Sequence, residues 1–275
     1  MKSVVFEDIK KIADKIQVKN KKEVIAISVE NKKPSLFESK FGGTPYVPKG
    51  KKIPENKNGD QLRLLAQLNL EDSFNNNLLP KKGMLQIFLR ADDLYGADFN
   101  DPTMQDDFRV IYYEDIDFTV NEEDIKKEIR SLEDEEEMFP IEGAYKIKFK
   151  EPVEEGISID DYDFEKLFLE EYNKVFTENK IDNIYDLDEE IYNKFAEEYA
   201  NDGHKIGGYP YFTQEDPRKY DSRDSFDTIL LQIDSEFGTG VEIIWGDSGI
   251  CNFFINSEDL KNCDFSRVLY NWDCC

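Results

Sequence analysis

The stretch GGTPY, residues 42–46, returns as GGYPY, residues 207–211, in a chain of 275 residues. Glycine tolerates a positive φ and proline fixes its own φ, so a Gly-Gly-x-Pro sequence is typical of a turn at the end of a strand. Two such turns 165 positions apart indicate that the chain contains an internal repeat.

Three further segments recur in the same order after each glycine turn. LLAQLNL (64–70) corresponds to LLQID (230–234), which places Gln67 and Gln232 at the same offset as the glycines. KKGMLQIFL (81–89) aligns with DSGICNFFI (247–255), and FRVIYYED (108–115) aligns with SRVLYNWD (266–273). This order predicts that one β-forming unit has been duplicated.

Short alternating strands separated by turns favour an antiparallel, β-dominated α+β fold. VIAISVE (24–30) and YKIKFKE (145–151) are each expected to add one strand to their own copy. We therefore predict a single domain over residues 1–275. It consists of a first repeat (1–118), an acidic helical connection (119–142) and a second repeat (143–275) with a helical insertion at about 160–202.

Helical periodicity is found at four places. The predicted apolar stripes are Phe6, Ile9, Ile12, Ala13 and Ile16 near the N-terminus; Ile125, Ile129 and Leu132 after a capping sequence at Asn121; Phe164, Leu167, Phe168, Tyr172 and Val175 after Asp163; and Ile191, Phe195 and Tyr199 after Asp188. Helices with such aromatic faces are expected to pack onto the sheet.

The stretch WGDSG (245–249) resembles the sequence around the nucleophile of serine proteases. In the repeat, however, Gly246-Asp247-Ser248-Gly249 takes the place of Pro80-Lys81-Lys82-Gly83, which has no nucleophile. A turn is therefore predicted here, and no catalytic residue is assigned. The residues predicted to build turns are Gly42, Gly43, Pro45, Gly83, Gly207, Gly208, Pro210, Gly246 and Gly249.

Four polar residues are candidates for a ligand site at the junction of the two repeats, namely Gln67, Gln232, His204 and Asp247. Two related halves create a cleft where they meet, and repeated polar side chains would converge there. The alternative for the glutamines is a buried side chain that satisfies a neighbouring strand or turn. The alternative for His204 is an imidazole that caps the glycine turn.

The net charge of −25 is concentrated in one third of the chain. Residues 114–202 contain 31 acidic and 10 basic residues, against 29 and 25 elsewhere. Such a surface repels phosphate backbones, so nucleic acid is not an expected partner. It would solvate the protein or attract a basic partner protein.

No cofactor or metal is predicted. The four cysteines, at 251, 263, 274 and 275, include no C-x-x-C pair, and the chain has one histidine. Free thiols are expected, and the role of Cys274 and Cys275 stays open. The apolar runs are too short to span a bilayer and the charged N-terminus does not fit a signal peptide, so a cytoplasmic location is expected.

The sequence resembles the YwqG family of bacterial proteins, which is defined as a domain of unknown function. The resemblance is carried by FGGTPYVP, LLAQLNL, LPKKGMLQIF, HKIGGYPYFTQEDPR, WGDSGICNFFI and FSRVLYNWDCC. It implies a β-rich, roll-like fold of two related halves and no established reaction. The favoured hypothesis is a protein-binding module, such as an immunity or antitoxin-like protein, that uses its acidic face. The alternative is a small-ligand-binding protein or enzyme.

Overall fold

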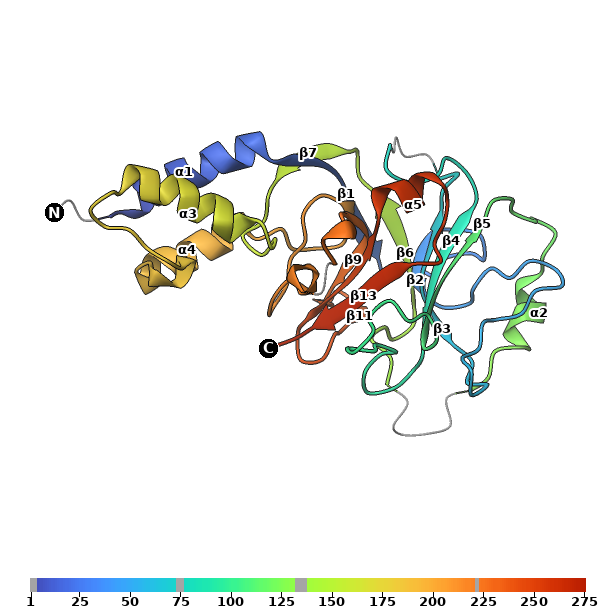
Figure 1. Ribbon diagram of the computed structural model, residues 1–275. Coiled ribbons are helices and arrows are strands. Elements are labelled where there is room, and N and C mark those ends of the chain that lie inside the picture. Colours follow the sequence, from blue (N-terminus) through green and yellow to red (C-terminus); the bar gives the residue numbers. More distant parts are fainter. Residues whose placement is uncertain (1–3, 73–76, 132–137, 221–222) are drawn as a thin grey trace.

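The computed structural model describes residues 4–72, 77–131, 138–220 and 223–275 (Figure 1). Its helices are α1 (Phe6–Lys19), α2 (Glu122–Lys126), α3 (Phe164–Val175), α4 (Glu189–Tyr199) and α5 (Ser257–Lys261). Its strands are β1 (Lys21–Glu30), β2 (Lys40–Gly42), β3 (Arg63–Asn69), β4 (Met84–Leu89), β5 (Phe108–Tyr113), β6 (Ala144–Phe149), β7 (Val153–Gly156), β8 (Lys205–Gly207), β9 (Thr228–Asp234), β10 (Glu236–Gly238), β11 (Val241–Ile243), β12 (Ile250–Ile255) and β13 (Val268–Asp273). The predicted β-dominated α+β class is confirmed.

The main sheet has the strand order β13-β12-β9-β8-β1-β6-β2-β3-β4-β5, with β7 also paired to β1. At its centre β1 and β6 run antiparallel, with Ile27 opposite Phe149 and Val29 opposite Ile147. Outward from this pair, each half has a short strand that ends at a Gly-Gly turn and then three strands in a meander. The series β6-β2-β3-β4-β5 on one side of the centre therefore corresponds, strand by strand, to the series β1-β8-β9-β12-β13 on the other.

The two halves exchange their first strands, which the sequence did not predict. β1 was expected to belong to the first repeat, but it pairs with β8 of the second, with Ile25 opposite Ile206. β6 was expected to belong to the second repeat, but it pairs with β2 of the first, with Tyr145 opposite Phe41. Both strands are apolar on alternate positions, so either would fit either half, and the central β1–β6 ladder fixes the choice.

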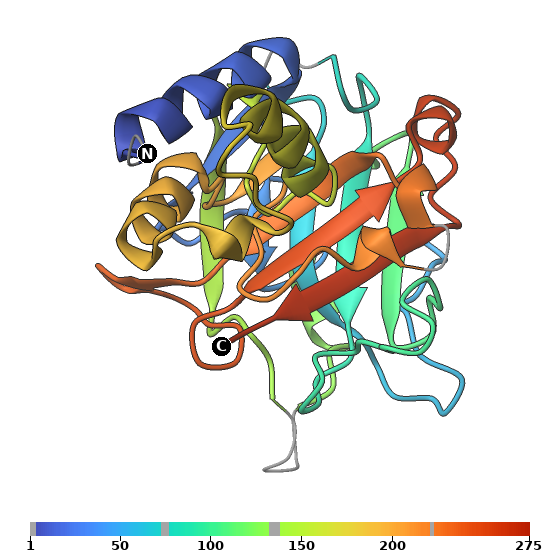
Figure 2. The ribbon, with the colours of Figure 1, turned by 60° about the vertical axis from the view of Figure 1, so that its left-hand side comes forward.

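The sheet is rolled so that its two halves pack face to face. Figure 2 shows β9, β12 and β13 crossing in front of β3, β4 and β5. Phe108 of β5 contacts Phe253 of β12 and Tyr270 of β13, with ring centroids 6.3 and 5.3 Å apart. These rings belong to one continuous apolar core that contains side chains of both halves. The burial of this core between two sheet faces is the main stabilising feature of the fold.

The N-terminal helix and the inserted helices form a separate helical layer beside the sheet (Figure 1). α3 and α4 begin after Asp163 and Asp188, as predicted, and contact α1. The layer has its own core, in which the buried residues are Ile9, Ile12, Ala13, Ile16, Ile157, Phe164, Phe168, Tyr172, Ile184, Leu187, Phe195, Tyr199 and Tyr209. The aromatic faces thus pack mainly against α1 and each other, and Val175 at the end of the predicted stripe is exposed.

The connection between the halves is less helical than predicted. Asn121 caps α2 by accepting a hydrogen bond from Glu123 N, and Ile125 is buried, but the helix ends at Lys126. Beyond it Arg130 N donates to Gln61 Oε1 at 3.0 Å, which draws the chain out of the helical path. The end of the predicted stripe at Leu132 and the acidic run 133–137 lie outside the described residues.

Candidate functional site

Gln67 is fully buried and holds the first glycine turn in place. Its Oε1 accepts hydrogen bonds from Tyr46 N and Gln86 Nε2, both at 2.8 Å. Its Nε2 donates to the carbonyl oxygens of Leu36 at 2.7 Å and Glu38 at 3.0 Å. All four hydrogen-bonding positions of the amide are therefore used within the protein.

Gln232 makes three of these four hydrogen bonds in the second half. Its Oε1 accepts from Tyr211 N at 3.0 Å, and its Nε2 donates to the carbonyl oxygens of Asn201 at 3.0 Å and Gly203 at 2.8 Å. Asn252 lies where Gln86 lies in the first half, and its side-chain amide donates to the Tyr211 carbonyl at 2.9 Å. Each glutamine thus fastens its own turn, and the two do not share a site.

His204 also has a counterpart, with which it shares one structural contact. Asp234 N donates to His204 Nδ1 at 3.0 Å, so the proton is on Nε2, which lies 2.9 Å from a carboxylate oxygen of Glu236. In the first half, Asn69 N donates to Ser39 Oγ at 2.9 Å in the corresponding position. A serine replaces the imidazole there, which indicates that His204 serves as a cap for the strand end.

Residues 246–248 form an exposed turn, in which Gly249 N donates to the Trp245 carbonyl at 2.7 Å. Asp247 and Ser248 are both exposed, and Asp247 lies against the Cys274 thiol. The histidine that a serine nucleophile would need is bound to Glu236 instead. All four cysteines are unpaired.

The predicted turn residues lie at strand ends or in turns. Gly42, Gly43, Gly207 and Gly208 have φ of +68°, +77°, +70° and +70°, and Pro45 and Pro210 follow them. Gly83 also has a positive φ, of +94°, and it shares a second constraint with Gly249. A Cβ at either would collide with the carbonyl oxygen of the adjacent strand, at Tyr113 or Asp273 respectively.

Among the described residues, the four candidate side chains do not converge on a polar cleft between the halves, because each glutamine is bonded within its own half. The junction is filled by the apolar core around Phe108, Phe253 and Tyr270. A shallow groove of about 400 Å³ lies at the rim between β5 and the loop 263–266. None of Gln67, Gln232, His204 and Asp247 lines it.

Two buried lysines were missed because charged residues were expected to be exposed. Lys40 is 2% exposed and donates to the carbonyl oxygens of Ser35 and Leu36 at 3.1 and 3.0 Å. Burial lowers the pKa of Lys40 to about 8 and also lowers the pKa of Lys205. The signal was present in the sequence, since a lysine precedes both glycine pairs, in KFGG (40–43) and KIGG (205–208).

A buried ion cluster was also missed. Arg218 is 2% exposed, and its guanidinium donates to Asp216 at 2.6 Å and to Asp161 at 2.8 Å. It lies over the rings of Phe254 and Tyr162. Desolvation raises the pKa of Asp161, and the Arg218 charge opposes this rise. The cluster joins the loop before α3 to the loop before β9.

The two glycine turns differ in what covers them. In the second half, Glu155 Oε1 accepts hydrogen bonds from Tyr209 N at 2.6 Å and Lys205 Nζ at 3.0 Å. This oxygen lies so close to Gly208 that a Cβ there would collide with it. Glu155 comes from β7, at the start of the inserted segment, and it fills the turn.

In the first half Gly43 is exposed and no described carboxylate takes the corresponding position. A Cβ at Gly43 would lie 2.6 Å from Ala144 Cβ, just as a Cβ at Gly208 would lie 3.0 Å from Val24 Cβ. Among the described residues, Thr44 N, the counterpart of Tyr209 N, has no hydrogen-bond acceptor. No helix or strand lies between β1 and β2, whereas β7 and the helices lie between β6 and β8, so the first turn has no residue equivalent to Glu155.

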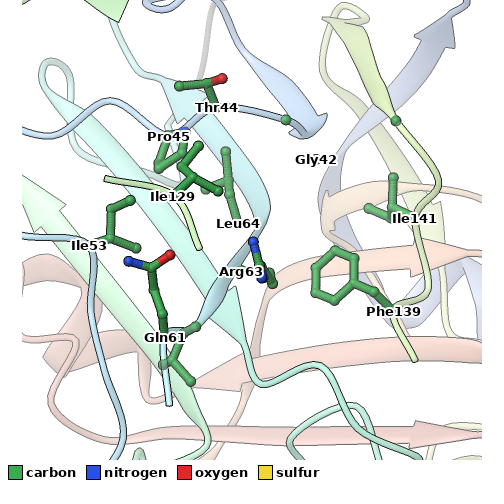
Figure 3. A pocket seen from close by; sticks show the side chains of 13 residues that line it. Gly42, Thr44, Pro45, Ile53, Gln61, Arg63, Leu64, Ile129, Phe139 and Ile141 are labelled. Carbon is green, nitrogen blue, oxygen red and sulfur yellow. The ribbon is translucent and has the colours of Figure 1, made fainter. Parts of the chain in front are cut away.

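Beside this open turn lies a hollow of about 350 Å³, which we call the first-turn pocket. It is lined by Gly42, Gly43, Thr44, Pro45, Ile53, Gln61, Leu62, Arg63, Leu64, Ile129, Phe139, Ile141 and Gly143. Figure 3 shows Ile53, Leu64 and Ile129 on one side, Phe139 and Ile141 on the other, and Arg63 between them. Gln61 also anchors the wall formed by the connection, because its Nε2 donates to the Glu128 carbonyl at 3.0 Å. The residues come from five separate segments of the chain.

Within the described residues, no three His, Cys, Asp or Glu side chains are grouped so that they could hold a metal ion. No helix of that part has the length and apolar character needed to cross a membrane. A comparison with curated proteins gives no match. Residues 39–274 match the family described as Domain of unknown function (DUF1963). Because this match covers most of the sequence, the chain belongs to the DUF1963 family.

Proposed function

We propose that the protein binds a small amphiphilic molecule in the first-turn pocket. The observation that carries the proposal is the composition of the pocket wall. Seven apolar side chains surround the hollow, and Thr44, Gln61 and Arg63 place a few polar groups among them. Ligand sites are typically concave and mostly apolar, with a small number of polar groups that orient the ligand.

The way the pocket is built also supports this function. Its floor is the glycine turn, which Gln67 fixes through Tyr46, and its far wall is the segment 139–143 that leads into β6. The turn is rigid because its backbone is bound to a fully buried amide. A pocket held by such contacts is formed before the ligand arrives, which lowers the entropic cost of binding.

The proposal predicts that a neutral probe, 4-phenylbutanamide, binds here with a dissociation constant in the millimolar range, as expected for a fragment of this size. Nuclear magnetic resonance titration of the ¹⁵N-labelled protein should shift the amides of Gly43, Thr44 and Ile141. Ile129→Trp should abolish these shifts, because the larger ring fills the hollow from the connection. Val175→Trp on the exposed end of α3 is the matched control and should leave them unchanged. Shifts that map elsewhere would contradict the proposal.

A second candidate function is the binding of a basic protein by the outer face of the helical layer. This is favoured by the packing of the layer, because its aromatic faces are used internally and Glu170, Glu189 and Glu197 are exposed to solvent. Such a surface would accelerate association with a positively charged partner through long-range attraction. Reversal of these three charges to lysine should remove any salt-sensitive basic partner from co-purification. A partner that still co-purifies after the charge reversal would show that this face is not its binding site.

A further inference from the structure

We infer that the ligand of the first-turn pocket carries a carboxylate, which is bound at the Gly43–Thr44 turn. The inference rests on the proposed function and specifies the chemical class of the ligand as a small apolar monocarboxylic acid. The second half of the same chain supports it, because the corresponding turn there already holds a carboxylate.

The second turn shows how a carboxylate is recognised. Glu155 Oε1 accepts from the backbone N–H of Tyr209 at 2.6 Å and lies against Gly208, where any side chain would collide with it. The same oxygen accepts from Lys205 Nζ at 3.0 Å. The carboxylate thus has a backbone donor, an adjacent cation and a glycine that allows close approach. Backbone N–H groups and cations are the donors that bind carboxylates most strongly.

The first turn has the same backbone. Gly43 has φ of +77°, close to the +70° of Gly208, and is exposed where Gly208 is buried. Beside Gly43 no described carboxylate takes the place that Glu155 has beside Gly208, and the neighbour that a Cβ at Gly43 would meet is Ala144, the counterpart of Val24 beside Gly208. A ligand carboxylate placed there would accept from Thr44 N as Glu155 accepts from Tyr209 N.

The surroundings of the first turn match the remainder of such a ligand. Among the described residues, Arg63 is the only charged one that lines the pocket, and its charge is positive in a protein of net charge −25. In the second half the residue that corresponds to Arg63 is Thr228, so the second turn has no cation at this position. The apolar walls beyond it, including Ile53 and Phe139, would take an aliphatic or aromatic body. The backbone donor, the cation and the apolar walls together select a carboxylic acid over a purely apolar molecule.

The test compares 4-phenylbutanoate with 4-phenylbutanamide, which have nearly the same shape and differ in charge. We expect the acid to bind wild-type protein about tenfold more tightly, since hydrogen bonds to charged groups are stronger than neutral ones. The Thr44 amide proton should move downfield with the acid and less with the amide. Arg63→Gln should weaken the binding of the acid more than the binding of the amide, and circular dichroism should confirm that this variant is folded.

The outcomes separate the two proposals. Equal affinity for acid and amide, both at the pocket, would overturn the carboxylate inference and leave the proposed function standing. Absence of binding by either compound at the pocket would overturn both. The wild-type comparison does not depend on the Arg63 variant, so a folding defect in that variant leaves the comparison of acid and amide intact.

Discussion

Replacing Arg218 with methionine should lower the free energy of unfolding by about 3–5 kcal/mol at pH 8, which is the effect measured when one partner of a buried ion pair is removed. Arg218 is almost fully buried and is bound to Asp216 and Asp161, which are 2% and 4% exposed. Methionine fills much of the same volume, but it leaves two buried carboxylates without the guanidinium that donates hydrogen bonds to them. The loss arises mainly from these buried negative charges.

The size of this effect should depend on pH. Burial raises the pKa of Asp161 even while Arg218 opposes the rise, so without Arg218 the carboxyl should take up a proton at a still higher pH. Protonation removes the buried charge, and the deficit should shrink as the pH falls from 8 to 5. Urea denaturation, followed by tryptophan fluorescence at pH 8 and at pH 5, would measure the difference in the free energy of unfolding.

Arg267 provides the matched control for this experiment. It is an exposed arginine of the same half and lies over the ring of Phe226. Arg267→Met should change the free energy of unfolding by no more than about 0.5 kcal/mol, as most surface substitutions do. A deficit for Arg218→Met that is equally small, or that grows toward pH 5, would show that the charges of the ion cluster do not stabilise the fold.

The repeated sequence was sufficient to predict the β-dominated fold and the positions of the turns, because glycine and strand periodicity act locally. It could not predict that β1 and β6 change halves. Both strands alternate in the same way, and the choice between partners depends on the central ladder in which Ile27 faces Phe149. Partner choice is a tertiary property that strand periodicity does not encode.

The candidate site was predicted only in part. The glycine turn was recognised, and Gln67 and Gln232 were candidates either for a junction site or for a structural role. Their hydrogen bonds to their own turns show the structural role. In a sheet that is buried on both faces, the sequence does not say on which face a glutamine lies. The first-turn pocket depends on Ile129 and Phe139, whose approach to the turn is set by the path of the connection. No spacing in the sequence indicates that approach.

The two glutamines should contribute equally to stability. Gln67→Leu leaves the N–H of Tyr46 and the carbonyls of Leu36 and Glu38 without their partner and removes one of the two acceptors of Gln86 Nε2. We expect a loss of about 3 kcal/mol. Gln232→Leu removes three equivalent hydrogen bonds in the second half and should cost about the same. Gln214→Leu is the control, because Gln214 is exposed and should change stability by less than about 0.5 kcal/mol.

The same two variants should differ in ligand binding, and this difference tests the pocket more directly than stability does. Gln67 holds Tyr46, and through it the turn that forms the floor of the first-turn pocket, so Gln67→Leu should weaken the binding of 4-phenylbutanamide. Gln232 holds the turn that Glu155 already fills, so Gln232→Leu should leave that binding unchanged in the folded protein. The titrations should be made under conditions in which urea denaturation shows that both variants are folded. Weaker binding in Gln232→Leu alone would place the ligand in the second half of the molecule, where the carboxylate of Glu155 would have to be displaced first.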